Sequence, residues 1–93
     1  MIKTFADKRT AALFAGRFVK RLPHDVAERA KRKLDLIDAA ADLRFLSVPL
    51  GNRLEALSGD RSGQHSIRVN DQWRICFRWR DGNAFDVEFC DYH

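Results

Sequence analysis

Hydrophobic and polar residues alternate along three runs late in the sequence, at residues 64–69, 73–80 and 84–90. The apolar members, mostly β-branched or aromatic, are all odd-numbered: Ile67, Val69, Trp73, Ile75, Phe77, Trp79, Phe85, Val87 and Phe89. A period of two in such residues indicates antiparallel strands that pack on one face only. The polar breaks at 70–72 and 81–83 therefore predict a meander of consecutive strands.

Keeping the odd positions on one face determines how the strands pair. The expected pairs are Val69 with Trp73, Ile67 with Ile75, Trp79 with Phe85, Phe77 with Val87, and Ile75 with Phe89. A one-residue slip would place Phe77 opposite Asp86 and expose half of the core, so three-residue loops are favoured over two-residue loops. Asn83 is suited to the left-handed conformation in which such a loop usually ends.

The even-numbered face of this sheet is polar and carries several arginines. Its members are Gln64, Ser66, Arg68, Arg74, Cys76, Arg78, Asp86, Glu88, Cys90 and Tyr92. Arg78 is expected opposite Asp86, so one interpretation is a solvated face with cross-strand ion pairs. The other interpretation is a phosphate-binding face that ends at Tyr92 and His93.

Helical signals precede the meander. Residues 1–5 are a candidate first strand, and Asp7 is suited to cap a short helix that continues through Phe14 and stops at Gly16. A longer helix is predicted from Pro23 to about Ala41, because apolar residues recur there at steps of three and four. These apolar positions are Val26, Ala30, Leu34, Ile37 and Ala41.

A second helical turn is expected over residues 42–49, with Phe45 and Leu46 turned inward. Residues 51–59 then form a short strand bracketed by glycines. The resulting order, β-α-α-β-β-β-β, predicts an α+β fold with an antiparallel-rich sheet and two helices packed on one face.

The composition limits the classes of function. Ninety-three residues suffice for one modest domain, and a net charge of +4 with a pI near 9.5 favours an anionic partner such as nucleic acid. The two cysteines lack metal-ligand spacing, and no apolar run approaches the length of a membrane span. In the absence of a signal peptide, we expect a cytoplasmic protein with reduced thiols.

Three polar residues are not needed for packing and suit a metal-independent ribonuclease. Such an enzyme needs a base for the 2′-hydroxyl, a cation for the phosphorane and an acid for the 5′-oxygen. Glu55, Arg74 and His93 are of suitable types for these roles. Spacing alone gives a weak signal, because any basic α+β domain offers such a trio.

Short motifs are distributed along almost the full length of the chain. They are Met1-Ile2-Lys3 followed by Phe5, Leu36-Ile37-Asp38-Ala39-Ala40, residues 53–63 with their Gly-Asp-Arg-Ser-Gly end, Ser66-Ile67-Arg68-Val69, Trp73-Arg74-Ile75 and Asp91-Tyr92-His93. In these motifs the chain resembles the HigB branch of the RelE/ParE superfamily of toxin–antitoxin proteins. These motifs are highly specific only in combination. The resemblance implies that residues 1–93 form a single RelE/HigB-like toxin domain.

It also implies an activity and partners. The family's toxins are endoribonucleases that cleave mRNA in the ribosomal A site, and a HigA-like helix-turn-helix antitoxin holds them inactive. Operator DNA would be bound only through that antitoxin. We expect no metal, no cofactor and no membrane partner.

By position, the resemblance assigns Arg74 to the scissile phosphate, and Asp91, Tyr92 and His93 to a terminal catalytic cluster. Glu55 departs from the family pattern, because many HigB-type toxins have a His there, between Leu and Pro. YoeB-type toxins resemble this chain in placing a Glu at that point as general base. The expected RNA-binding residues are Arg53, Arg61, Arg68 and Arg78.

Two alternatives remain open. One is a ParE-like toxin of the same fold that inhibits gyrase, and the terminal Asp-Tyr-His argues against it. The other is a non-catalytic ribosome- or RNA-binding module that uses only the arginine face. The remaining histidines are set aside, because His24 lies in the first turn of a helix and His65 is expected on the core side.

Overall fold

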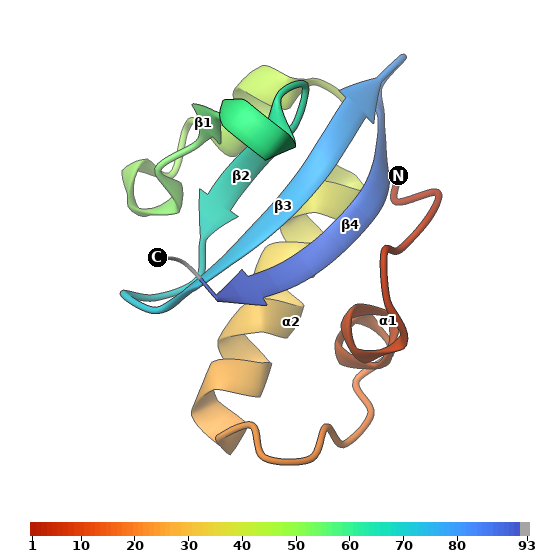
Figure 1. Ribbon diagram of the computed structural model, residues 1–93, viewed down its shortest axis with the longest axis vertical. Coiled ribbons are helices and arrows are strands. Elements are labelled where there is room, and N and C mark those ends of the chain that lie inside the picture. Colours follow the sequence, from red (N-terminus) through yellow and green to blue (C-terminus); the bar gives the residue numbers. More distant parts are fainter. Residues whose placement is uncertain (92–93) are drawn as a thin grey trace.

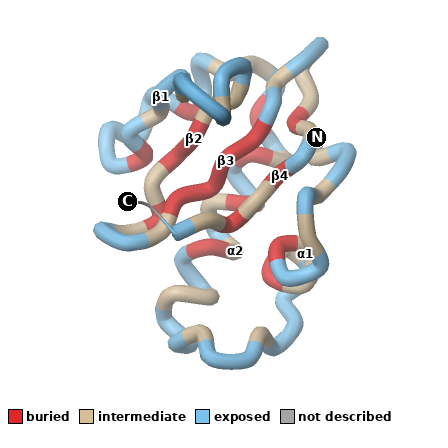
Figure 2. The backbone as a smooth tube through the Cα atoms, in the orientation of Figure 1, coloured by how far each residue is buried: buried red, intermediate tan, exposed pale blue. Residues whose placement is uncertain are grey.

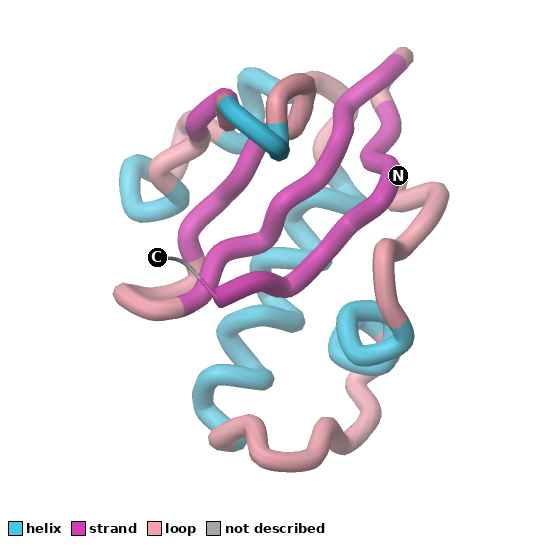
Figure 3. Tube along the Cα trace, in the orientation of Figure 1, coloured by secondary structure: helices cyan, strands magenta, loops and turns pink. Residues whose placement is uncertain are grey.

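The computed structural model describes residues 1–91, so Tyr92 and His93 lie outside the described residues. Two helices, α1 (Lys8–Phe14) and α2 (His24–Ala39), precede a four-stranded sheet in the order β1-β2-β3-β4. The strands are β1 (Glu55–Ala56), β2 (His65–Arg68), β3 (Trp73–Arg80) and β4 (Asn83–Asp91), all antiparallel (Figure 1). Short 3-10 helices, η1 (Leu43–Leu46), η2 (Leu50–Asn52) and η3 (Gly59–Arg61), connect α2 to β2 (Figure 3). This arrangement confirms the predicted α+β class.

The core lies between α2 and the odd-numbered face of the sheet (Figure 2). Ala30, Leu34 and Ile37 of α2 are completely buried, as are Ile67, Ile75, Phe77 and Phe89 of the strands. Their periods of 3.6 and two residues place both sets on one face of each element, which explains why they meet. Among residues 1–91, no helix has both the length and the apolar character needed to cross a membrane.

Two positions expected to face the core are exposed. Phe45 is 60% exposed, while its neighbour Leu46 is 2% exposed. Both lie in η1, and a 3-10 helix has about three residues per turn, so adjacent side chains point in different directions and only one of them can face inward. Ala41 is exposed because α2 ends at Ala39, and Ala40 takes the buried place instead.

Helix α1 begins and ends as predicted. The Oδ1 atom of Asp7 accepts a hydrogen bond from the backbone N–H of Thr10 at 2.7 Å, which satisfies one free donor of the first turn. Gly16 follows the helix with φ +74°, a conformation that favours glycine.

The expected first strand is less regular than predicted. Residues 1–6 run parallel to β4 but form only isolated bridges with it, Ile2 to Ala84 and Phe5 to Val87. Four backbone hydrogen bonds of 2.8–3.1 Å join the two segments. The segment nevertheless covers the outer edge of β4, so that this edge is not available for pairing with another chain.

The hairpin between β3 and β4 differs from the predicted one. Arg80 pairs with Asn83, so the loop has two residues, Asp81 and Gly82, with φ of 52° and 77°. Positive φ at both central positions is typical of a type I′ turn, for which Asp-Gly is a favoured sequence. The three-residue loop and the left-handed Asn83 are therefore wrong, and Trp79 pairs with Ala84 rather than with Phe85.

A β-bulge restores the predicted register farther along the hairpin. At the bulge, Phe77 of β3 lies opposite two residues of β4, Asp86 and Val87. The regular pairs on either side are Arg78–Phe85 and Cys76–Glu88. Asp86 adopts φ 53°, and its backbone N–H donates to Oγ1 of Thr4 at 2.8 Å. Beyond the bulge, Ile75 pairs with Phe89 as predicted.

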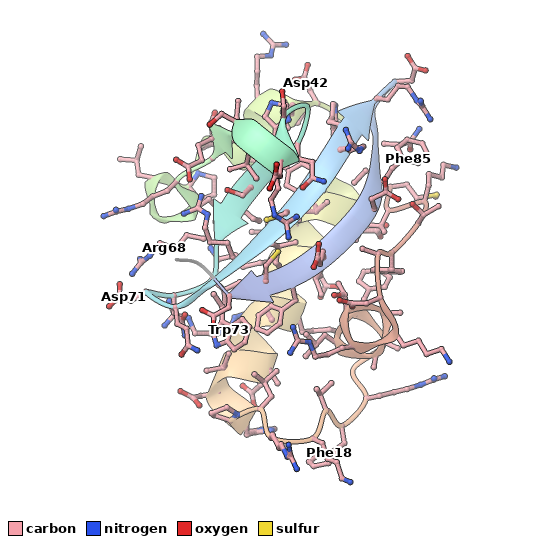
Figure 4. All side chains as sticks on the ribbon, viewed as in Figure 1. Phe18, Asp42, Arg68, Asp71, Trp73 and Phe85 are labelled. Atoms are coloured by element: carbon pink, nitrogen blue, oxygen red, sulfur yellow. The ribbon has the colours of Figure 1, made fainter. Side chains whose placement is uncertain are left out.

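The bulge also changes which side chains enter the core. Ala84 is completely buried and Phe85 is only half-buried. The guanidinium of the exposed residue Arg80 lies 4.7 Å from the centre of the Phe85 ring, so this ring packs against a surface side chain (Phe85 is labelled in Figure 4). The prediction that Phe85 faces the core is therefore wrong.

Candidate active site

Arg74, in β3, is the most constrained charged side chain of the polar face. It is only 6% exposed, and no other charged residue in the described range is so deeply buried. Its Nε donates to Oγ of Ser66 at 2.8 Å, and its Nη2 donates to the carbonyl oxygen of Arg53 at 2.8 Å. A buried guanidinium requires such acceptors, because unpaired donors away from water are costly. These contacts hold the planar group in one orientation.

The local backbone explains why these acceptors converge. Ser66 of β2 pairs with Cys76 of β3, and Arg74 of β3 pairs with Arg68 of β2. Ser66 and Arg74 are therefore diagonal neighbours, in adjacent rows of residue pairs on the same face of the sheet. Both side chains point to the face opposite α2. Arg53 adopts φ 46° at the end of η2, just before β1, and its carbonyl oxygen meets Nη2 of Arg74. Its contribution to the site is therefore a backbone group, while its side chain is exposed.

Glu55 completes this cluster from the edge strand β1. Its Oε1 lies 3.2 Å from Nη2 of Arg74, and the side chain of Glu55 is 46% exposed while that of Arg74 is 7% exposed. The structure thus pairs an accessible carboxylate with an oriented cation. A substrate that approaches the edge of the sheet would meet the carboxylate first and the guanidinium behind it.

Two of the other predicted arginines, Arg61 and Arg78, form ion pairs with residues of β4. Arg61 of η3 donates to Glu88 at 3.1 Å and to Gln64 at 3.0 Å. The hydrogen bond to Glu88 raises the pKa of Arg61. Nε of Arg78 lies 3.5 Å from Oδ2 of Asp86, which confirms the predicted cross-strand ion pair. The pair forms even though the backbone of Arg78 is paired with Phe85 and not with Asp86.

Arg68 and Asp91 lie at the opposite end of the sheet from the β3–β4 turn. Arg68 forms an ion pair with Asp71 of the β2–β3 loop, where the two labelled side chains are adjacent (Figure 4). Asp91 pairs with Trp73 across the strands, and its Oδ2 accepts a 3.5 Å contact from Nε2 of Gln72. Tyr92 and His93, the other members of the predicted terminal cluster, lie outside the described residues.

Sequence reasoning did not assign a role to Ser66 or to the cysteines. Ser66 is completely buried and positions Arg74 through a hydrogen bond. The sequence signal for this contact was the place of Ser66 on the even-numbered face, diagonal to Arg74 in the predicted register. Cys76 and Cys90 approach to 3.1 Å between their sulfur atoms. They too are diagonal, since Cys76 pairs with Glu88 and Cys90 pairs with Arg74.

The two histidines set aside remain apart from the candidate site. His24 lies in the exposed first turn of α2, with its Nε2 2.6 Å from Oε1 of Glu28. The ring of His65 stacks on that of Phe77, with centroids 6.3 Å apart, and its Nδ1 is buried without a hydrogen-bond partner in the described structure.

Sequence comparisons identify close relatives. Residues 3–93 match the profile of a family described as "RelE-like toxin of type II toxin-antitoxin system HigB". The chain is 42% identical over 72 residues to "Toxin HigB-1" of Vibrio cholerae, covering 77% of this chain and 75% of that protein. It is 34% identical to "Endoribonuclease HigB" of Proteus vulgaris over 93 residues, which is the full length of both chains.

Solved structures share the fold at low sequence identity. A mutant of YafQ from E. coli superposes with a TM-score of 0.66 at 14% identity, covering 98% of this chain and 91% of that chain. A chain of the YoeB–YefM complex from Staphylococcus aureus gives a TM-score of 0.61 at 16% identity, covering 100% of this chain and 98% of that chain. At such identities the similarity establishes the architecture alone.

Proposed function

The chain belongs to the HigB-like family of RelE-like toxins from type II toxin–antitoxin systems, and from this premise we propose that it is an endoribonuclease that cleaves mRNA in the ribosomal A site. A toxin of such a system acts with an antitoxin, and we infer a HigA-like protein with a helix-turn-helix domain. Operator DNA would be contacted only through that antitoxin. Because its substrate lies on ribosomes, the protein would act in the cytoplasm.

The observation that carries this proposal is the contact between Glu55 and Arg74. General bases must lie within hydrogen-bond reach of the proton that they remove, and a phosphate-binding cation must lie beside them. The carboxylate of Glu55 is exposed, while Arg74 is buried and oriented by Ser66 and Arg53. A 2′-hydroxyl and its adjacent phosphate have the size to contact both groups at once.

On this proposal, Glu55 removes the proton from the 2′-hydroxyl, and the 2′-oxygen attacks the adjacent phosphorus. Arg74 stabilises the negative charge that develops on the phosphorane oxygens, with greater effect because its surroundings exclude water. His93 donates a proton to the departing 5′-oxygen. The products are a 2′,3′-cyclic phosphate and a 5′-hydroxyl, and no metal ion takes part.

The remaining predicted residues would bind rather than react. Tyr92 would stack on a base or hydrogen-bond to the mRNA, and Asp91 would orient His93. The side chains of Arg53, Arg61, Arg68 and Arg78 would contact phosphates of mRNA or ribosomal RNA. Such contacts release counterions, so binding to ribosomes should weaken as the salt concentration rises.

The proposal is tested by primer extension on a defined mRNA, with and without translating ribosomes. We expect ribosome-dependent cleavage by the wild-type protein, and a loss of about 10²–10⁴-fold in Glu55→Gln and in His93→Gln, the usual contribution of general acid–base groups. Glu28→Gln is the matched control, because Glu28 also forms a carboxylate–arginine ion pair, with Arg32 on exposed α2. It should cleave like the wild type.

Intact mRNA on translating ribosomes with wild-type protein would contradict the proposal. Toxicity that persists in His93→Gln would instead support a non-catalytic ribosome-binding module. Inhibition of gyrase supercoiling by the purified chain would support the ParE-like alternative.

A further inference from the structure

The Cys76–Cys90 pair lies beside the candidate active site but has no role in the proposed cleavage. Cys76 of β3 is 5% exposed, and Cys90 of β4 is half-buried. Their sulfur atoms are 3.1 Å apart, and both thiols are free. The two residues point to the polar face of the sheet, where Cys90 is paired across the strands with Arg74.

The surroundings of the pair shift the pKa values of its two thiols in opposite directions. The hydrogen bond from Cys90 lowers the pKa of Cys76, and burial opposes this effect. The charges of Arg61 and Arg74 also lower this pKa, while the charge of Glu88 raises it. The same hydrogen bond, together with burial, raises the pKa of Cys90. Since the thiolate is the reactive form of cysteine, these opposite shifts favour Cys76 as the attacking sulfur of the pair.

We propose that Cys76 and Cys90 form a peroxide-sensitive dithiol that closes into an intramolecular disulfide between β3 and β4. In the first step, the Cys76 thiolate attacks one oxygen of a hydroperoxide, the O–O bond breaks, and a sulfenic acid and hydroxide (or alkoxide) form. In the second step, the sulfur of Cys90 attacks the sulfenic sulfur, loses its proton and expels the hydroxyl group as water. Both sulfurs are oxidised together by two electrons, and the peroxide is reduced.

The strand geometry allows the second step without new backbone pairing. A disulfide has sulfur atoms about 2.05 Å apart, so the two atoms need to approach by about 1 Å from their present separation. The pairs Cys76–Glu88 and Arg74–Cys90 already hold the strands in adjacent rows. Diagonal neighbours in a sheet have Cα atoms about 7–8 Å apart, slightly farther than a relaxed disulfide spans, so closure needs rotation of both side chains and a small shift of the two strands. The sulfenic acid also forms next to its partner, which limits further oxidation.

The disulfide would cross-link the end of β4 to β3 diagonally, from the row that contains Arg74 to the adjacent row of Cys76 and Glu88. Residues 91–93 follow directly after Cys90, so the cross-link would restrain the strand that leads to the predicted terminal cluster. The chemistry of the pair does not depend on ribonuclease activity. A failure of either proposal would therefore leave the other standing.

The test treats reduced protein with hydrogen peroxide and then denatures it for thiol counting with a maleimide and for intact mass measurement. We expect both thiols to disappear with one rate constant, the mass to fall by two hydrogen atoms, and dithiothreitol to restore both thiols. Peptide mapping should find one peptide pair joined through Cys76 and Cys90 in monomeric protein.

Cys90→Ser is the matched variant, because Cys90 is the less buried of the two. Its Cys76 should instead gain oxygen atoms or form disulfide-linked dimers. Wild-type protein that shows the same products as Cys90→Ser, or that retains both thiols after Cys76 in the variant has been oxidised, would overturn the proposal. The peptide map of the wild-type protein decides the question even if the variant fails to fold.

Discussion

Replacing Ser66 by alanine tests whether the orientation of Arg74 depends on its buried acceptor. Ser66 is completely buried, and its Oγ accepts from Nε of Arg74 at 2.8 Å. In Ser66→Ala, this N–H loses that acceptor in a place that water does not reach. A hydrogen bond to a charged group contributes about 1.5–3 kcal/mol, so we expect the free energy of unfolding to fall by about 2 kcal/mol.

The structure sets an upper limit on that estimate. Arg74 retains its bond to the carbonyl oxygen of Arg53 and its ion pair with Glu55, so the guanidinium is not stripped of partners. The loss should therefore be smaller than the roughly 3–5 kcal/mol for breaking a buried ion pair by removing one partner. For a domain of this size, a loss of 2 kcal/mol lowers Tm by about 8–16 °C.

The assay is urea unfolding followed by the fluorescence of Trp73 and Trp79, both in β3. Ser47→Ala serves as control, because its hydroxyl bonds to the carbonyl oxygen of Arg44 at an exposed position. That variant should change stability by about 0.5 kcal/mol or less, as is usual for surface substitutions.

A double-mutant cycle with Arg74→Met separates this bond from general packing. If Ser66 acts through Arg74, then Ser66→Ala should be much less costly in the Arg74→Met background, with a coupling of about 1 kcal/mol or more. A coupling near zero, or a Ser66→Ala loss no greater than that of Ser47→Ala, would refute the reasoning.

Three further substitutions test the elements that support the site. Asp7→Ala removes the cap of α1 and should cost about 1 kcal/mol in urea unfolding; an unchanged midpoint would contradict the capping contact at 2.7 Å. Thr10→Val leaves the N–H of Phe89 without its 2.9 Å acceptor and should cost about 1–3 kcal/mol, with faster exchange of that amide. Gly63 has φ +90°, and the Cβ atom added by Gly63→Ala would lie 3.0 Å from Nη1 of Arg78, so the free energy of unfolding should fall by about 1 kcal/mol or more. Equal or greater thermal stability of this variant would exclude the left-handed conformation.

Periodicity predicted the fold well where burial alone decides which face a residue occupies. The period of two placed Ile67 opposite Ile75 and Ile75 opposite Phe89, and the period near 3.6 identified the buried stripe of α2. The Asp-Gly pair at 81–82 was a readable signal for the two-residue turn, but it conflicted with keeping Phe85 inside. The bulge at Asp86 resolves that conflict. No local sequence pattern predicts this bulge, because the backbone N–H of Asp86 donates to Thr4, a residue from the other end of the sequence.

The candidate site was predicted by residue type and resemblance rather than by geometry. Both routes selected Glu55 and Arg74, which lie 3.2 Å apart. The role of Ser66 depends on a diagonal contact between strands, and that of the Arg53 carbonyl depends on a left-handed backbone at φ 46°. Neither is visible in the spacing of residues along the chain. The catalytic roles assigned to these side chains remain predictions.

The most direct test of the central claim uses an mRNA with a single 2′-deoxynucleotide on the 5′ side of the cleaved bond. Attack by the 2′-oxygen requires that hydroxyl, so translating ribosomes with wild-type toxin should leave the modified message whole at that bond. The unmodified message should yield a 2′,3′-cyclic phosphate and a 5′-hydroxyl. Cleavage of the deoxy-substituted bond at an undiminished rate would contradict the account, because the proton that Glu55 is proposed to remove would be absent.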